Sequence, residues 1–310
     1  MDEKKTVRLH PIVFSKISIN PLNDMSHSTE LPTVVYSPES KIRSPRQLIR
    51  QMFQDLGRSR ELAWRLFVRD LSAQYRQSFL GIFWAFIPPI VTSLVFILLQ
   101  SRRIFNFDKT DIPYPVYVLV GTILWQLFAE SLSAPLKTVT NAKAILSKIN
   151  IPYESLILSS FFSLLFSLLM KLVVLLAIFL IFKIKLSWMT LLSPLVFILL
   201  ILLGLCIGLF LTPWGMLYTD ISSSLPIVTQ LWFFITPVIY PVPTTYPLSL
   251  IAVLNPVTPL LVGARDLAIR GLLVNPAPFL IISSLIPIAL FITWVIFRLS
   301  IPIIIERISS

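Results

Sequence analysis

Charged side chains are scarce in this sequence of 310 residues: they make up 13% of it, whereas hydrophobic residues make up 55%. Soluble domains usually carry about a quarter charged residues, so this composition excludes an ordinary soluble protein. Apolar runs close to the roughly 20 residues that a helix needs to cross a bilayer recur along the chain. The sequence therefore predicts an integral membrane protein with no room for a separate enzymatic domain.

Cysteine and histidine are almost absent, which excludes several kinds of site. The single cysteine, Cys206, rules out a disulfide framework within the chain, and the two histidines, His10 and His27, fall in the N-terminal segment. No set of metal ligands is available from these residues. The sequence also lacks a G-x-x-x-x-G-K-[ST] loop, so we expect no nucleotide site, no bound cofactor and no enzymatic activity of its own.

Positive charge is plentiful by comparison, with 26 Lys and Arg against 15 Asp and Glu. Half of the basic residues precede residue 79, which favours membrane orientation over nucleic-acid binding. If the N-terminus is cytoplasmic, the inside segments carry 18 Lys and Arg, counting Arg298 at the inner end of the last span, and the outside segments carry 7, so we expect both termini in the cytoplasm. This count assumes six membrane spans, at residues 79–101, 114–136, 156–182, 190–213, 224–241 and 278–298.

The predicted fold is an all-α integral membrane protein with six transmembrane helices, preceded by an amphipathic interfacial helix. The segment 242–277 is too apolar for an exposed loop and too rich in proline for a span, so it predicts short re-entrant helices, with a surface loop as the alternative. We expect the chain to divide into four parts. The first is a disordered cytoplasmic extension without a secretory signal (1–45), and the second is the interfacial region (46–78). The membrane spans (79–298) and a cytoplasmic tail (299–310) follow.

The interfacial helix is expected over residues 59–78. On a wheel of about 100° per residue its charged side chains share one arc and its apolar side chains the opposite one. Asp70 interrupts the apolar arc and has no basic residue three or four positions away. Its charge is therefore expected to be met by another helix or subunit, or else by lipid headgroups and water. The two arcs are Glu61, Arg65, Arg69, Ser72 and Arg76, and Leu62, Ala63, Leu66, Phe67 and Leu71.

Glu130 and Lys171 are ionisable residues inside apolar runs, where such groups are functional candidates. Taking the spans to end at 136 and to begin at 156, Glu130 lies about 10 Å and Lys171 about 22 Å from the inner membrane surface. That difference in depth argues against a salt bridge between them. We expect Glu130 to be solvated near the interface and Lys171 to extend its amine outward.

Three motifs resemble one family. The stretches "RDLSAQYRQSFLGIFWAFIPPI" (69–90), "LWFFITPVIYP" (231–241) and "LNPVTPLLVGARDLAIRG" (254–271) are similar to those of the ABC type-2 permeases that export polysaccharides, including O-antigen, capsule and teichoic-acid exporters. The resemblance covers about residues 59–300. It departs from the family in "YTDISSSLP" (218–226), where Thr219 stands at a position that is commonly basic.

The resemblance implies a homodimer in the inner (cytoplasmic) membrane, with each copy bound to a cytoplasmic ATPase subunit that holds ATP and Mg. It implies further that the segment between spans two and three is a coupling helix that docks in a groove of that ATPase. An apolar patch beside polar residues suits such docking. The docking candidates are Asn141, Lys143, Ile145, Leu146, Lys148 and Ile149.

The resemblance also implies that spans one and five face a conduit for a lipid-linked polysaccharide. Aromatic rings suit this role because the C–H faces of sugars stack on them. The candidates are Phe83, Trp84, Phe86, Trp232, Phe233, Phe234 and Tyr240. Pro88, Pro89, Pro237 and Pro241 should kink or end these helices, and Arg65, Arg69 and Arg76 are placed to meet lipid headgroups or the pyrophosphate of an incoming substrate.

Three other functions compete with this one. An ion-coupled secondary carrier or lipid-linked sugar flippase usually carries acidic or histidine groups near the membrane midplane and repeats its span architecture. A membrane-embedded sugar-phosphate transferase needs clustered carboxylates, whereas Asp220, Asp266 and Glu306 are isolated in the sequence. An ABC exporter of small drugs would lack the interfacial-helix motif. The sequence favours the polysaccharide exporter.

Overall fold

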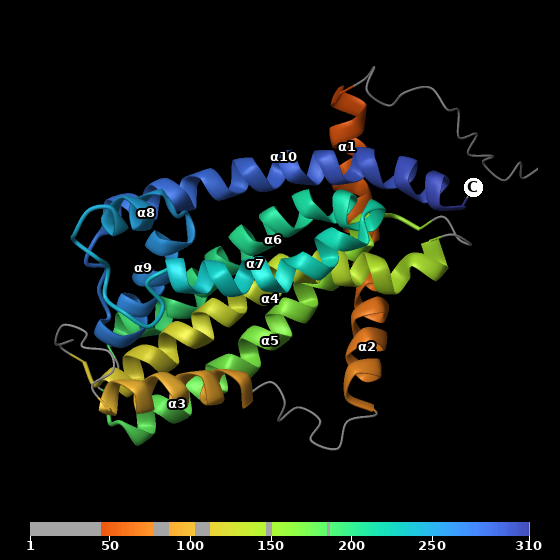
Figure 1. Cartoon of the computed structure of the whole chain (residues 1–310). Helices are drawn as coiled ribbons and strands as arrows, with labels where there is room; N and C mark the ends of the chain where they lie inside the picture. Colours follow the sequence, from red (N-terminus) through yellow and green to blue (C-terminus); the bar gives the residue numbers. More distant parts are fainter. Residues whose placement is uncertain (1–44, 77–86, 103–111, 147–150, 185–186, 310) are drawn as a thin grey trace, which may run out of the picture. The chain divides into compact units, whose positions relative to one another are not determined.

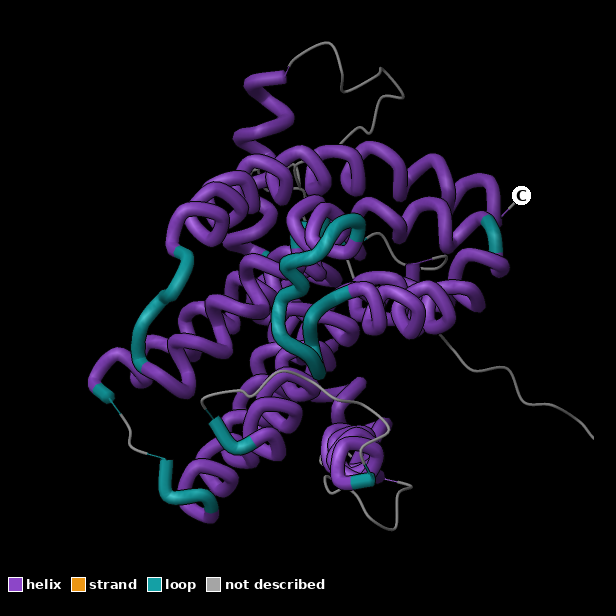
Figure 2. The backbone as a smooth tube through the Cα atoms, turned by 60° about the vertical axis from the view of Figure 1, so that its left-hand side comes forward, coloured by secondary structure: helices purple, strands orange, loops and turns teal. Residues whose placement is uncertain are grey.

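The computed structural model describes residues 45–76, 87–102, 112–146, 151–184 and 187–309. Within these ranges the chain is helical and has no strand, so the all-α prediction is confirmed for the described part (Figures 1 and 2). The predicted disordered extension lies outside it, apart from Pro45. The helices are α1 (Pro45–Arg58), α2 (Arg60–Arg76), α3 (Ile87–Ser101), α4 (Tyr114–Leu146), α5 (Glu154–Ile181), η3 (Trp188–Leu192), α6 (Ser193–Leu217), α7 (Thr219–Ile235), α8 (Leu248–Leu254), α9 (Val257–Arg270) and α10 (Pro276–Ser309).

Four segments are long and apolar enough to cross a membrane: α4, α5, the η3–α6 segment and α10. A fifth results if α8 and α9, which meet at 86°, form one broken span. The predicted count of six is therefore not confirmed. The described part of the first predicted span is α3, with 15 residues, and residues 79–86 of that span lie outside the described part. The fifth predicted span is α7, with 17 residues.

Proline sets the end of α7, as the sequence predicted. The helix stops at Ile235, and Thr236 is already extended (φ −85°, ψ 138°) just before Pro237. A proline ring clashes with a helical residue before it, so the chain leaves the helix at that point. Short helices then follow, as predicted, in α8 and α9, and their bend fits either a broken span or a re-entrant loop.

Helices α4 and α6 form the centre of the described part. Helix α4 packs against α3, α5, α6, α7 and α9, and α6 packs against α4, α5, α7, α9 and α10 (Figure 1). Of the four long segments, α4 is the most buried and α10 the least. Small residues let the two central helices approach closely: a Cβ at Gly208 of α6 would stand 2.4 Å from the carbonyl oxygen of Leu132 in α4.

Gly208→Ala is therefore expected to force α4 and α6 apart and to lower the free energy of unfolding by about 1–3 kcal/mol. Thermal unfolding of the purified protein in detergent measures this effect. Gly57→Ala is the matched control, because a Cβ at Gly57 in α1 meets nothing within 4 Å. That control should be neutral or stabilising, and an equal loss in both variants would contradict the close-approach argument.

Helix α2 is amphipathic, as the sequence predicted, and its apolar face covers part of α5. Ala63, Leu66 and Phe67 are buried, and the Phe67 ring lies 6.3 Å from the rings of Phe162 and Phe166 in α5. The opposite, charged face is largely exposed. The amphipathic pattern is thus satisfied by protein as well, and the position of α2 in the membrane interface stays a prediction.

The expectation that the charge of Asp70 is not met within its own helix is wrong. Arg69, the preceding residue, pairs with it at 2.7 Å between Nη2 and Oδ1, and its Nε donates to the same oxygen at 2.9 Å. The flexible arginine side chain reaches back from the charged arc to its neighbour. Spacing rules for residues three and four apart do not cover a contact between adjacent residues.

A buried arginine holds the chain after α7. Arg265 of α9 is buried, and its Nη1 donates to the carbonyls of Pro237 and Val238 at 3.2 and 3.1 Å. Its guanidinium lies 3.8 Å from the centre of the Tyr117 ring in α4. These contacts satisfy carbonyls left without helical partners where α7 ends, and they fix α9 to α4.

A second arginine, which is largely buried, joins three helices. Arg298 of α10 forms ion pairs with Glu154, the first residue of α5, and with Asp55 of α1, the latter at 2.6 Å. Its side chain is 10% exposed and that of Glu154 is 1% exposed. Helix α10 itself continues without a break from Pro276 to Ser309.

Candidate functional site

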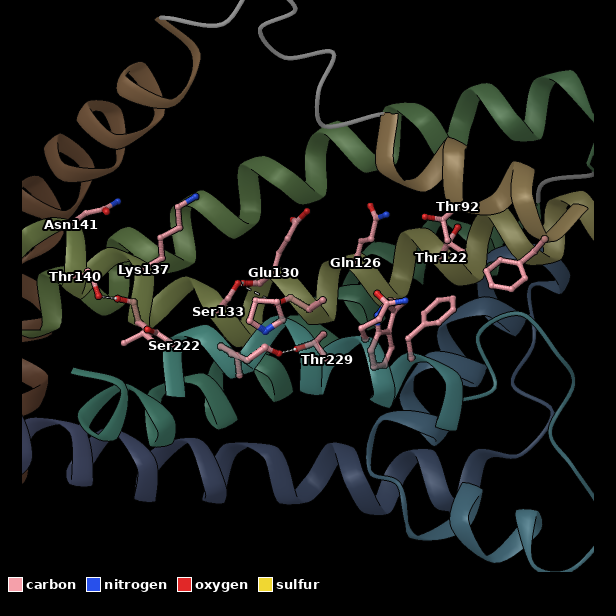
Figure 3. A pocket seen from close by; sticks show the side chains of 18 residues that line it. Thr92, Thr122, Gln126, Glu130, Ser133, Lys137, Thr140, Asn141, Ser222 and Thr229 are labelled. Atoms are coloured by element: carbon pink, nitrogen blue, oxygen red, sulfur yellow. Dashed lines mark hydrogen bonds between the residues drawn. The ribbon is translucent and has the colours of Figure 1, made fainter. Parts of the chain in front are cut away.

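A pocket of about 600 Å³ lies between α3, α4 and α7. Figure 3 shows its lining, in which Gln126, Glu130 and Lys137 project from one side of α4. Helix α3 contributes Thr92 and Phe96. Helix α4 contributes Thr122, Trp125, Gln126, Ala129, Glu130, Ser133, Leu136, Lys137, Thr140 and Asn141. Helix α7 contributes Ser222, Leu225, Pro226, Thr229, Gln230 and Phe233.

The polar side of this pocket is a stripe along α4. Its lining residues from Thr122 to Asn141 recur three or four positions apart, which places them on one face of the helix. At 1.5 Å per residue the stripe is about 28 Å long, close to the roughly 30 Å of a bilayer core. The sequence analysis missed it, although the same spacing is readable in the sequence, because it treated 114–136 only as an apolar run.

Glu130 and Lys171 form a salt bridge at the middle of this stripe, so the expectation that they lie apart is wrong. Lys171 Nζ lies 2.7 Å from both carboxylate oxygens of Glu130, and it also donates to Ser167 Oγ at 2.7 Å. The Lys171 side chain is 2% exposed, so it does not extend outward, whereas that of Glu130 is 45% exposed and lines the pocket.

The depths predicted for Glu130 and Lys171 were wrong because the predicted span limits differ from the ends of the helices. Helix α4 continues to Leu146 and α5 begins at Glu154, ten residues later and two residues earlier than the predicted span limits. Measured from these ends, Glu130 and Lys171 lie about 24 and 26 Å along their helices. They therefore reach nearly the same depth, and an ion pair that neutralises a buried ammonium is far cheaper than leaving it unpaired.

Of the predicted channel aromatics that the structure describes, only Phe233 lines the pocket. It packs there with two rings that the sequence analysis missed, Phe96 at 5.9 Å and Trp125 at 5.8 Å between ring centres. Phe234 is exposed and does not line the pocket. Phe83, Trp84 and Phe86 lie outside the described residues.

Trp232 and Tyr240 make contacts within the protein instead of lining the pocket. The indole nitrogen of Trp232 donates to Asn255 Oδ1 at 3.1 Å, and its ring lies 5.2 Å from that of Phe128. Tyr240 donates its hydroxyl to the carbonyl of Phe234 at 2.9 Å, and its own carbonyl accepts from Tyr117. Both residues hold the connection between α7 and α8 to its surroundings.

The basic residues proposed to meet headgroups do not reach the pocket. Arg65 is exposed and pairs with Glu61 at 2.6 Å, Arg69 pairs with Asp70, and Arg76 is exposed. All three belong to α2, which contributes none of the described residues that line the pocket. No group of three or more His, Cys, Asp or Glu side chains in the described ranges could hold a metal ion.

The proposed docking residues divide by exposure. Asn141 and Lys143 are exposed near the C-terminal end of α4, Ile145 is half-buried, and Leu146 is buried in the protein's own core. Lys148 and Ile149 lie outside the described residues. A partner that approaches this end therefore meets Asn141 and Lys143 first.

Comparison with known proteins gives one family and two relatives. Residues 61–268 match the family described as ABC-2 type transporter. The O-antigen export system permease protein RfbA of Myxococcus xanthus is 26% identical over 256 residues, which cover 81% of this chain and 95% of the relative. The protein of the same name from Klebsiella pneumoniae is 23% identical over 211 residues, which cover 66% and 79%.

Proposed function

The chain belongs to the ABC-2 type transporter family, and from that membership we propose that it is the permease through which an exporter moves a lipid-linked polysaccharide across the cytoplasmic membrane. Several membrane-length helices make it a multi-pass membrane protein. The two relatives named as O-antigen export permeases support a glycan of the O-antigen type, and the motif resemblance extends the proposal to capsular and teichoic-acid types. We expect both termini in the cytoplasm.

The observation that carries this proposal is the pocket between α3, α4 and α7. A polysaccharide that crosses the bilayer loses its water, and polar groups without replacement partners would make that loss costly. The stripe on α4 offers such partners over about 28 Å, while Phe96 of α3, Trp125 of α4 and Phe233 of α7 offer apolar rings. This combination suits a chain of sugars, which are polar at their edges and apolar on their faces.

The energy source would be a separate ATPase subunit that holds ATP and Mg. We place its docking site at the C-terminal end of α4, where Asn141 and Lys143 are exposed. A second copy of the chain would complete the conduit. The exposed apolar faces of α3 and α7, which border the pocket, support this arrangement; they include Ile90, Val91, Leu94, Ile227, Val228 and Leu231.

Two measurements test the proposal. Deletion of the gene in its own host should remove a glycan from the cell surface, and the intact gene should restore it. The tagged protein, purified in mild detergent, should bring along an ATP-binding subunit at about one copy per permease, by quantitative mass spectrometry. Unchanged surface glycan in the deletion strain would refute the substrate, and an intact complex without an ATPase would refute the energy source.

Lys143→Glu should weaken retention of the ATPase subunit by about tenfold, because it reverses the exposed charge at the proposed docking end. The ratio of the two subunits after a wash at fixed salt measures this loss. Lys183→Glu is the matched control, since Lys183 is an exposed lysine just beyond the opposite end of α5. Equal retention in both variants would place the docking site elsewhere.

One observation favours a second candidate, an ion-coupled carrier. Glu130 and Lys171 form an ion pair near the middles of long apolar helices, where coupling-ion sites are often found. The two candidates differ in their energy source. Export that stops when the membrane proton gradient is collapsed, while ATP is kept constant and no ATPase subunit is present, would favour the carrier.

A further inference from the structure

Most of the hydroxyl groups in the described pocket lining are left to act as hydrogen-bond acceptors. Five of them donate to backbone carbonyls of their own helices, at 2.7–3.1 Å. A carbonyl oxygen can only accept, so the hydroxyl hydrogen is used in that bond and only the lone pairs of its oxygen remain for a ligand. These residues are Thr122, Ser133, Thr140, Ser222 and Thr229. Thr122 is buried and already accepts from Ser93 at 2.8 Å, so it offers least to a ligand.

Glu130 adds the strongest acceptor at the middle of the pocket. Its carboxylate is fixed by Lys171 and Ser167 from the α5 side, and its side chain remains 45% exposed. The positive charge that balances it is buried behind it, because the Lys171 side chain is 2% exposed. A ligand in the pocket therefore meets the carboxylate and not the ammonium group.

Donors are fewer in the described lining. The amides of Gln126, Gln230 and Asn141 donate and accept equally well, as does the hydroxyl of Thr92, and the indole of Trp125 donates. Lys137 is the one basic residue among the described residues that line the pocket. It lies seven residues from Glu130, about 10 Å along α4 toward the inner end, so it does not offset the carboxylate locally.

We propose, resting on the exporter function above, that this pocket binds a neutral, hydroxyl-bearing segment of the glycan and disfavours segments that carry phosphate or carboxylate groups. A sugar hydroxyl donates a hydrogen bond to each acceptor that the pocket presents. Phosphate and carboxylate groups have only acceptor oxygens when ionised, so they find few donors there and are repelled by Glu130. The aromatic side formed by Trp125, Phe96 and Phe233 suits the apolar face of a sugar ring.

Photo-crosslinking in the host's own membranes tests what the pocket holds. The probe is benzoylphenylalanine at Gln126, with the same probe at Leu169 as control, an exposed α5 residue away from the pocket. The expected adduct at Gln126 carries a glycan whose repeating sugars, by mass spectrometry, are neutral, with phosphate only in the link to the lipid. An adduct whose repeating sugars carry phosphate or uronic acid, or no glycan at Gln126 beyond that at Leu169, would overturn the proposal.

Removal of two acceptors tests what the pocket does. Thr140→Val combined with Thr229→Val keeps shape and loses two hydroxyls, and it should lower the surface glycan per permease molecule by about tenfold. Thr212→Val is the matched control, since Thr212 donates in the same way to Gly208 at 2.7 Å but lies outside the pocket. Normal export by the double variant, in a strain whose deletion mutant lacks the glycan, would overturn the pocket proposal alone. Unchanged glycan in the deletion mutant would overturn the exporter function itself.

Discussion

Replacing Arg298 by methionine is expected to lower the free energy of unfolding by about 3–5 kcal/mol. Arg298 of α10 is the shared partner of Glu154, whose side chain is 1% exposed, and of Asp55 in α1. Methionine fills a similar volume but leaves Glu154 as a buried charge without its guanidinium. Thermal unfolding in detergent, or the fraction that stays monodisperse after heating, measures the loss.

Two further variants separate this effect from a general loss of arginine. Arg58→Met removes an exposed arginine of α1 and should change stability by less than about 0.5 kcal/mol. Glu154→Gln in the Arg298→Met background removes the stranded charge and should recover part of the loss. Equal unfolding midpoints for Arg298→Met and the wild type would show that the three helices are held together by other contacts.

Glu130→Ala is expected to be the second severe change, on the order of 3 kcal/mol, because it leaves the ammonium group of Lys171 buried without a carboxylate. The reverse change, Lys171→Leu, should cost less, since the Glu130 side chain is 45% exposed and keeps its hydrogen bond from Ser167. The structure thus predicts an asymmetry between the two halves of one ion pair. Unfolding midpoints of the two single variants measure it.

The double variant Glu130→Ala with Lys171→Leu completes the cycle. It removes both charges and should be more stable than Glu130→Ala, because an apolar pair needs no desolvation of ions. Transport by this double variant has to be measured separately from its stability, because the pocket loses its central hydrogen-bond acceptor. Equal losses from the two single variants would indicate that Glu130 has no access to water in the pocket.

Local features of the chain were predictable from the sequence. Membrane character follows from hydropathy. The amphipathic character of α2 follows from the helical spacing that puts its charged and apolar side chains on opposite arcs. The end of α7 follows from Pro237, and the two short helices α8 and α9 from the mixture of apolar residues and prolines. Each of these is a property of neighbouring residues, which a sequence displays directly.

The pocket was only half predictable. The motif "LWFFITPVIYP" led to the prediction that Phe233 lines the channel, and the structure places Phe233 at the pocket. Phe96, Trp125 and the α4 stripe also line the pocket but were not predicted. The stripe has a sequence signal, a polar residue every third or fourth position. Trp232 illustrates the opposite error: it belongs to the same motif, but its rotation on α7 turns it toward Asn255.

The sequence by itself determined that this chain is a helical membrane protein of a transport family, because composition, periodicity and motif order are contained in consecutive residues. Only the tertiary structure decided which distant charges meet. Lys171 finds Glu130, and Arg298 finds Glu154 and Asp55, because the lengths of α4 and α5 and the packing of the helices bring these residues to the same places. Relative depth and rotation of helices come from side-chain packing between them, as at Gly208 against Leu132, and no local pattern encodes them.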